Sequence, residues 1–356
     1  MPALDPRAQP MLHHWGCNAI RGIFGKVFWV TGRGAHLAVH IVGSINIDII
    51  TSLQRLPLPG ETVLAEATAR LPGGKGANQG VAAARMGAQV HFVGAVGEDD
   101  SGKWMVQRLA MEGIDVDGIR MLPGEATGTA YIAVDALGEN QIIVVSGANA
   151  RLGGCVPVDG GVLLSQLEVP IPALASLLAE SSALRILNTA PALVEAKALF
   201  PHVDILVLNR PELDVYAPAA QVRAPLPGED AEMAALAART RTLFCREDQA
   251  AIVTLGAGGA LIVRQGSLVH VPSIPVQPVD TVGAGDCFCG ALAALLDEGR
   301  TLEQAVPFAC AAAALSTLSH GAAPSMPSRA VVSDLLSEPA TEHALPIKNR
   351  SAAILP

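Results

Sequence analysis

The segment 279–296, VDTVGAGDCFCGALAALL, places a carboxylate directly after three residues with almost no side chain. The apolar run that follows Asp286 predicts a helix beginning near Ala284. The first N–H groups of a helix have no partner within it and attract anions, and Gly283, Ala284 and Gly285 leave them uncovered. This arrangement fits phosphoryl transfer, in which Asp286 accepts a hydroxyl proton while the helix end stabilises charge on the phosphoryl oxygens. A plain helix cap is the alternative interpretation of Asp286.

A second Gly-rich turn precedes another predicted helix, in RLPGGKGANQG (70–80). Its glycines, Gly74 among them, allow the backbone to approach a ligand closely. Lys75 and Asn78 supply donors that suit a hydroxyl-rich ligand. The alternative interpretation is a flexible turn with an exposed lysine.

Polar groups also interrupt or end two apolar runs. In HIVGSINIDII (40–50), predicted as the first strand, Asn46 and Asp48 are two residues apart and therefore share a face. A carboxylate such as Asp48 can accept two sugar hydroxyls at once. Glu168 in SQLEVP ends another apolar run, and ligands of α/β folds bind beyond the carboxyl ends of the strands. A solvated strand end is the alternative for either place.

Two standard nucleotide motifs are not matched. GEDDSGK (97–103) has the spacing of a P-loop, but Trp104 stands where a Ser or Thr would hold magnesium, and the preceding acids would repel phosphate. No GxGxxG follows the first predicted strand, so a dinucleotide site loses its main support.

The composition favours small ligands over nucleic acid or membrane. The 356 residues are 50% hydrophobic and 16% charged, with a net charge of -9, which leaves no broad positive field for a phosphate backbone or an anionic membrane. The least charged stretch, 306–327, is apolar only as far as Leu318 and is too short for a membrane span. The six cysteines lack zinc spacing and are predicted to be reduced thiols of a cytoplasmic protein.

From His40 onward, β-rich runs alternate with helical ones, which predicts an α/β fold with a mostly parallel central sheet flanked by helices. Further strands are predicted over 90–97, 162–168, 184–191 and 204–210, and two more within 250–265. Helices are predicted over 77–88 and 101–113, from about Ala284 and Leu302, and over 328–338.

A separate small β-sheet is predicted as a lid. The segment 129–147 contains two alternating runs joined by Gly-Glu-Asn, which is a hairpin signal, and 61–71 is strand-like. The lid strands are therefore expected within about 51–71 and 127–147 of one domain, 40–336. Residues 1–39 are predicted to be an extension outside this domain, with organelle targeting as an alternative, and 337–356 to be a tail.

Eleven motifs occur in an order that identifies a family resemblance. They are GSINID, GGKGANQ, TGTAYI, GEN, GANA, QLE, LNTAPA, NRPE, TLGAGGA, DTVGAGD and HGAAPSMP. Over about 40–336 the chain resembles the ribokinase branch of the PfkB-type sugar kinases, and GGKGANQ and GAGD are its specific motifs. The resemblance implies a three-layer fold, a β lid that closes over the sugar and forms a homodimer contact, and phosphorylation of the 5-hydroxyl of D-ribose by ATP.

The resemblance also implies roles for individual residues. Asp286 is the expected base, and Gly283, Ala284 and Gly285 form the anion hole. Asn209 and Glu212 match the pair that organises Mg²⁺ and the phosphates, often through water. The expected sugar-binding residues are Asn46, Asp48, Gly74, Lys75, Asn78, Glu168 and Asp286, and the expected ATP-binding residues are Asn209, Thr254, Gly256, Gly285 and Cys310.

An activating K⁺ is implied near the anion hole, held mostly by backbone carbonyls, because oxygen-only ligation suits potassium. The matching positions are Asp280, Val282, Ser316, Ser319, Gly321 and Ser325.

The chain departs from the family pattern in two places within the domain. The segment 150–161 is shorter and richer in Gly than expected, and Cys310 stands where relatives usually carry Asn or His near the adenine. Deoxyribose, a ribonucleoside or a ketohexose remain alternative acceptors, and a catalytically silent sugar sensor is the alternative outside the enzymes.

Overall fold

The computed structural model describes residues 19–21, 27–29, 38–219 and 229–337. The chain divides into two compact units, residues 1–35 and 36–356. In the first, β1 (Ala19–Arg21) and β2 (Val27–Trp29) pair antiparallel. The predicted tail lies outside the described residues, except for Ser337 at the end of α8.

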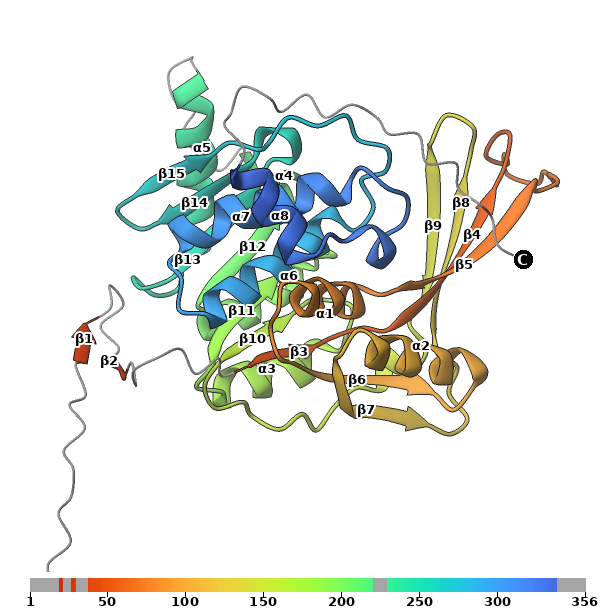
Figure 1. Ribbon diagram of the computed structural model, residues 1–356, viewed down its shortest axis with the longest axis horizontal. Coiled ribbons are helices and arrows are strands. Elements are labelled where there is room, and N and C mark those ends of the chain that lie inside the picture. Colours follow the sequence, from red (N-terminus) through yellow and green to blue (C-terminus); the bar gives the residue numbers. More distant parts are fainter. Residues whose placement is uncertain (1–18, 22–26, 30–37, 220–228, 338–356) are drawn as a thin grey trace, which may run out of the picture. The chain divides into compact units, whose positions relative to one another are not determined.

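A nine-stranded sheet runs through the second unit (Figure 1). Its strands from β7 to β13 are parallel, whereas β14 and β15 each pair antiparallel with their neighbour. In spatial order they are β15 (Leu268–Val271), β14 (Ala260–Arg264), β13 (Ala250–Thr254), β12 (Ile205–Asn209), β11 (Leu184–Asn188), β10 (Val162–Ser165), β3 (Val39–Val42), β6 (Val90–Gly97) and β7 (Asp115–Leu122).

Both faces of this sheet are covered by helices, which confirms the predicted three layers. Alternate strand residues enter two separate apolar clusters: Leu164 packs into one and its neighbour Leu163 into the other. The first cluster is closed by α1 (Lys75–Arg85), α2 (Asp100–Met111), α6 (Ala284–Asp297), α7 (Leu302–Ser316) and α8 (Arg329–Ser337), and the second by α3 (Ile171–Glu180), α4 (Arg210–Tyr216) and α5 (Glu229–Arg241).

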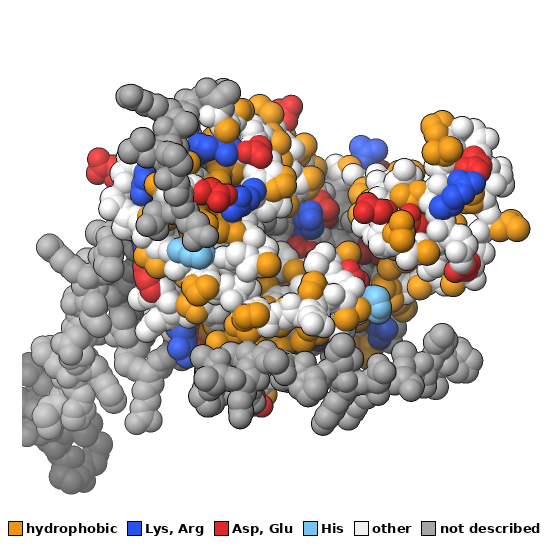
Figure 2. Space-filling view, turned by 90° about the horizontal axis from the view of Figure 1, so that it is seen from above, with side chains coloured by type: hydrophobic (Ala, Val, Ile, Leu, Met, Phe, Trp, Pro, Cys, Tyr) orange, Lys and Arg blue, Asp and Glu red, His pale blue; other side chains and the backbone are white. Residues whose placement is uncertain are grey.

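The predicted second, smaller sheet is present and contains the predicted hairpin, but its strand β4 begins at Asn46, before the range expected for the lid strands. Its order is β5 (Ala67–Gly73), β4 (Asn46–Ser52), β8 (Gly128–Val134) and β9 (Asn140–Val145), and it stands apart from the central sheet in Figure 1. β8 and β9 pair antiparallel across the predicted turn. In the space-filling view, acidic and basic side chains gather in the hollow between the lid and the body (Figure 2).

The prediction of one strand over 40–50 is wrong. The chain leaves the central sheet after Val42 and enters the lid at Asn46, so β3 and β4 belong to different sheets. Gly76 packs against this break, since a Cβ there would lie 2.7 Å from the backbone of Ser44. The apolar pattern continues through the break because Ile45 is buried as well.

Four elements of the second unit were not predicted: β7, β15, α4 and α5. β7 forms one edge of the central sheet, and its residues are half-buried or exposed, so it carries little apolar signal. Among the described residues, no helix is long and apolar enough to cross a bilayer. The five cysteines of the described part are unpaired, as predicted.

Candidate active site

The GGKG turn passes from lid strand β5 into helix α1 and has no space for side chains at two of its glycines. Gly74 has φ +90°, and a Cβ there would lie 2.7 Å from the backbone nitrogen of Asn46. A Cβ on Gly76 would meet the backbone of Gly43 and Ser44. The turn is therefore pressed against the break between β3 and β4, which brings the predicted residues of both segments together.

Glu168 is held at this junction by groups from both segments. Its Oε2 accepts a hydrogen bond from the Ser44 hydroxyl at 2.6 Å and from the backbone N–H of Lys75 at 3.1 Å. Ser44 was not predicted as a site residue, although it lies within GSINID. These bonds fix a carboxylate beyond the end of β10, where the sequence placed a ligand-binding acid.

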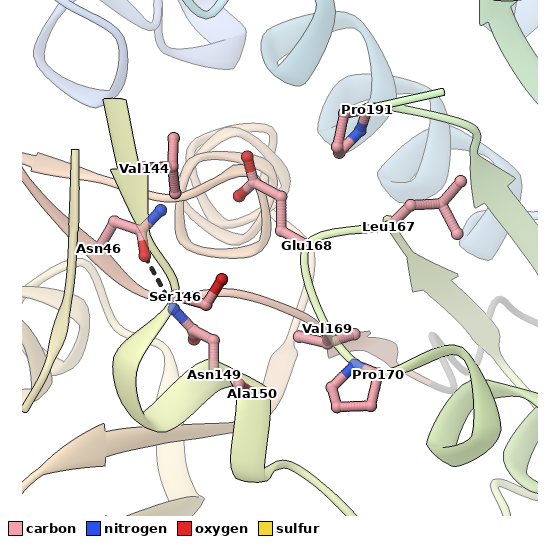
Figure 3. A pocket seen from close by; sticks show the side chains of 10 residues that line it. All are labelled: Asn46, Val144, Ser146, Asn149, Ala150, Leu167, Glu168, Val169, Pro170 and Pro191. Atoms are coloured by element: carbon pink, nitrogen blue, oxygen red, sulfur yellow. Dashed lines mark hydrogen bonds between the residues drawn. The ribbon is translucent and has the colours of Figure 1, made fainter. Parts of the chain in front are cut away.

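Asn149, which was not predicted as a site residue, orients the side-chain amide of Asn46. Asn149 Nδ2 donates to Asn46 Oδ1 at 2.8 Å (Figure 3), and its own Oδ1 accepts from the N–H of Ile45 at 2.9 Å. The amide nitrogen of Asn46 is left free to donate elsewhere. The GANA motif was the available signal for Asn149.

A pocket of about 420 Å³ opens beside Glu168 and Asn46. Figure 3 shows their side chains together with Ser146 and Asn149 along its polar wall. The rest of its lining is apolar: Val144, Ala150, Leu167, Val169, Pro170 and Pro191. A mostly apolar lining with a few polar groups suits a small hydroxyl-bearing ligand.

Asp286 lies in the first turn of α6 and is buried. Its Oδ2 accepts from Asn78 Nδ2 at 3.0 Å and its Oδ1 from Gln79 Nε2 at 2.9 Å. Burial raises the pKa of Asp286, and the charge of Lys75 and the two amide donors oppose this rise. The result is a fixed carboxylate with increased basicity.

Asp48 faces the same centre from the lid. Burial and the charges of Glu168 and Asp286 raise the pKa of Asp48 to about 6, and Lys75 opposes this rise. Burial lowers the pKa of the Lys75 ammonium, but the surrounding carboxylates, Asp286 first, raise it more. Lys75 is thus a charged ammonium at the meeting point of several acids.

A second pocket, of about 210 Å³, lies at the N-terminus of α6. Lys75, Gly283, Gly285 and Asp286 line it, and so do the predicted Asn209, Glu212 and Thr254. Predicted residues from the GGKG turn, from the ends of β12 and β13 and from the start of α6 thus line one pocket. Five other lining residues were not predicted as site residues: Asn188, Ala190, Val207, Leu208 and Cys289.

Asn209 and Glu212 hold each other in a capping box at the start of α4. Asn209 Oδ1 accepts from the N–H of Glu212 at 2.8 Å, and Glu212 Oε2 accepts from the N–H of Asn209 at 3.0 Å. Burial raises the pKa of Glu212, and the N–H of Asn209 is the largest opposing cause. Since Glu212 faces the phosphate-sized pocket with one oxygen bonded, its other oxygen suits a water-mediated contact to Mg²⁺.

Gly283 begins α6 in a left-handed conformation, with φ +78°. A Cβ on Gly283 would lie 2.7 Å from both Cα and Cβ of Ala322, so only glycine fits. The N–H of Ala284 donates a hydrogen bond to the carbonyl of Thr281 at 3.3 Å. A Cβ on Gly285, in contrast, would have no atom within 4 Å. Gly285 thus offers the open approach that an anion needs.

Asp280 joins the loop before Gly283 to the loop after α7. Its Oδ1 accepts from the N–H of Val282 at 2.9 Å and its Oδ2 from the N–H of Gly321 at 2.8 Å. The carbonyl of Thr317, which was not predicted, accepts from the N–H groups of Val279 and Asp280. Three of the predicted K⁺ positions are thereby brought together.

The other three predicted K⁺ positions lie on or after α7. The Ser316 hydroxyl donates to Ala313 O, and the Ser325 hydroxyl donates to Ala322 O, so both hydroxyls make local bonds. Ser319 is exposed in the intervening loop. Backbone carbonyls, rather than these hydroxyls, are therefore the donors that this region offers.

The two departures from the family pattern have different surroundings. Cys310 is buried in the core cluster on α7, and this burial raises the pKa of its thiol to about 12. In the 150–161 segment, Leu152 packs into the second cluster, so part of the segment is anchored. Gly256, predicted near the nucleotide, has φ +58° and open space around it.

A family model described as pfkB family carbohydrate kinase matches residues 37–329, nearly the whole second unit. The chain belongs to the pfkB carbohydrate kinase family. Among curated members it is 35% identical to the ribokinase of Haemophilus influenzae over 300 residues, which are 81% of this chain and 95% of the relative. It is also 35% identical to the ribokinase of Bacillus subtilis, over 83% of this chain and 98% of the relative.

Solved kinases of this family share the fold of the chain. The ribokinase of Arabidopsis thaliana, complexed with ribose and ATP, superposes with a TM-score of 0.74 at 32% identity and covers 85% of this chain and 99% of its own. The ribokinase of Cryptococcus neoformans, in complex with ADP, gives 0.73 at 31% identity, over 84% of this chain and 98% of its own. The predicted resemblance to ribokinases and the predicted fold class are therefore confirmed.

Proposed function

We propose that the protein transfers the γ-phosphoryl group of ATP to the 5-hydroxyl of D-ribose, giving D-ribose 5-phosphate and ADP. One observation carries the proposal: the buried carboxylate of Asp286 and the N-terminus of α6 face one small pocket, next to the larger pocket lined by Glu168 and Asn46. The similarity to ribokinases, one of them solved with ribose and ATP, supports the choice of substrates.

In this proposal Asp286 removes the proton of the 5-hydroxyl as the oxygen attacks the γ-phosphorus. The bond from phosphorus to the bridging oxygen breaks, and ADP leaves. The N–H groups at Gly283 and Gly285 stabilise the phosphoryl oxygens, and Lys75 adds positive charge on the same side. The carboxylate and the anion hole therefore act on opposite partners of one transfer.

The sugar is held from the lid side and the body side. Asp48 and Asn46 come from β4, Gly74, Lys75 and Asn78 from the turn and helix that follow β5, and Glu168 from the loop after β10. In the nucleotide site, Thr254 and Asn209 contact the phosphates, and Gly256 and Cys310 flank the adenosine.

Two cations accompany the reaction in this proposal. Glu212 and Asn209 would organise Mg²⁺ through water, and the ion would shield the phosphate charges. Carbonyls around Asp280, Val282 and Gly321, together with Ser316, Ser319 and Ser325, would hold K⁺. The loops that would hold K⁺ also flank Gly283, because Asp280 joins the N–H of Val282, the residue before Gly283, to the N–H of Gly321 after α7.

The acceptor and the cation are tested together by measuring ADP release from Mg-ATP with ribose, deoxyribose, fructose and adenosine, in K⁺ and in a large organic cation. We expect the highest kcat/KM with ribose and a kcat roughly tenfold or more lower without K⁺, because a displaced loop misplaces the N–H donors. Equal turnover in both cations would refute the K⁺ site. A higher kcat/KM with another acceptor would make that acceptor, instead of ribose, the substrate.

The affinity for ribose is expected to fall as the pH drops through about 6, which is where the pKa of Asp48 lies. Only the ionised carboxylate accepts two hydroxyls, so protonation should weaken binding by up to about 10²-fold. Calorimetric titration with ribose between pH 5 and 8 measures this. In the Asp48→Asn variant the affinity should be low across that range, and a wild-type pH dependence in the variant would exclude the assignment.

We further propose a homodimer through the lid. β9 is an edge strand, and it exposes Ile142, Ile143, Val144 and Val145, beside Tyr131 on β8. An exposed apolar edge of this kind is typically covered by a partner. A purified protein that sediments only at the monomer mass would exclude this assembly.

A further inference from the structure

Gln79 is the fifth residue of α1, directly after the predicted sugar ligand Asn78, and is fully buried. All of its amide atoms have partners. Nε2 donates to Asp286 Oδ1 at 2.9 Å and to Asn188 Oδ1 at 3.2 Å, and Oε1 accepts from Gln166 Nε2 at 2.7 Å. The side chain thus connects the proposed base to two further buried amides.

The contacts of Gln79 with Asp286 and with Gln166 agree on which end of its amide faces Asp286. With the amide reversed, its oxygen would point at a carboxylate oxygen and its nitrogen at the donor of Gln166, so both contacts would become repulsive. Gln166 lies just after β10 and is itself fully buried. The core therefore presents an N–H donor to Asp286 at a fixed position.

Neither donor to Asp286 is among the described residues that line the two pockets. Asn78 holds Oδ2 and belongs to the predicted sugar-binding set. Gln79 holds Oδ1, and it reaches the small pocket through its bonds to Asp286 and Asn188, which both line that pocket. Each carboxylate oxygen keeps a further lone pair with which it can accept a proton from substrate.

We infer that Gln79 is a positioning residue for phosphoryl transfer, which holds the Asp286 carboxylate in its reactive orientation and in its ionised form. This inference rests on the proposed role of Asp286 as base. The physical reason is that a buried carboxylate loses hydration, and an N–H donor that is already fixed replaces part of it. Without the donor, the carboxylate gains rotational freedom and binds a proton more readily.

Several other titratable groups face Asp286, and the inference must be separable from them. The Lys75 ammonium stabilises the ionised form of Asp286, and the nearby carboxylate of Glu168 destabilises that form. The thiols of Cys287 and Cys289 stay neutral, because burial raises the pKa of both. A neutral replacement of Gln79 leaves all these groups in place, and the remaining acids are Asp48, Glu168 and Glu212.

The test is the pH dependence of kcat in Gln79→Met, which keeps the length of the side chain but removes the amide. We expect kcat to fall about 10- to 100-fold at neutral pH, and the acid limb of the profile to move up by about one to two pH units. The KM for ribose should stay within about twofold. An unmoved acid limb, with or without a lower kcat, would overturn the inference.

Gln249→Met is the matched control. Gln249 is equally buried, accepts from the N–H groups of Cys245 and Arg246, and donates to two carbonyls remote from the pockets. Its replacement should lower the melting temperature while leaving kcat and its pH profile unchanged. If Gln79→Met does not fold, Gln166→Met carries the test, with a smaller shift in the same direction expected and no shift contradicting the inference.

The Asp286→Asn variant, assayed in parallel, distinguishes a wrong assignment of the base from a wrong role for Gln79. If this variant retains turnover, the proposed base is wrong and the inference falls with it. If it loses turnover while the acid limb of Gln79→Met matches that of the wild type, only the positioning role of Gln79 is wrong.

Discussion

Replacing Asp286 with Asn should lower kcat by about 10³-fold, since an amide cannot accept the hydroxyl proton. The change preserves the shape of the side chain at a site whose neighbours, Asn78 and Gln79, both donate to it. One of these donors would then face the new amide nitrogen, so some loss of stability is also expected. Steady-state ADP release at saturating ribose and ATP measures the effect on turnover.

Ribose binding provides the control for this variant. Calorimetry should show an affinity within about tenfold of wild type, because the other sugar contacts remain. A sugar sensor would keep its ribose response in the variant, whereas a kinase would keep binding and lose transfer. Turnover within tenfold of wild type would exclude Asp286 as the base.

The Gly283→Ala variant should lose about 10²- to 10³-fold in kcat, which is the cost of losing one fixed donor to a developing charge. A methyl group at this position would lie 2.7 Å from Ala322, at a backbone φ of +78°. Relief of that overlap must move either the start of α6 or the loop after α7. Either movement displaces the anion hole relative to Asp286.

Gly299, just beyond the other end of α6, offers the matched control. Its φ is +79°, but a Cβ there would meet open space. Gly299→Ala therefore introduces similar backbone strain, about 1–2 kcal/mol, without a collision. Its melting temperature should fall while kcat remains at the wild-type value. Equal losses of kcat in both variants would show that general destabilisation, and not the anion hole, explains the result.

Much of the architecture was predictable because the apolar residues follow a clear helical or strand periodicity, except where the chain passes from β3 to β4. The helix at the GAGD motif begins at Ala284 as predicted, whereas the helix at GGKG begins at Lys75, two residues before its predicted start. The lid hairpin followed from the Gly-Glu-Asn turn. Ligands of α/β folds bind beyond the carboxyl ends of the strands, so Glu168 could be assigned to a binding site without coordinates.

The transfer of the chain from one sheet to another was not predictable, because periodicity reports burial and not the partner strand. Ile45 and Ile47 are both buried, so the apolar pattern runs through the point where β3 ends and β4 begins. The same limit explains why Ser44 and Asn149 were missed. Their roles come from hydrogen bonds across 124 and 103 residues of sequence.

Transfer of phosphate to the 5-hydroxyl of ribose can be read from the position of the phosphate on the product. Uniformly ¹³C-labelled ribose is incubated with Mg-ATP, K⁺ and the enzyme, and the product is examined by ¹³C and ³¹P NMR. The proposed function predicts a single phosphate coupled to C5, formed in equal amount with ADP. Phosphate on another carbon, or ADP release without a phosphorylated sugar, would contradict it.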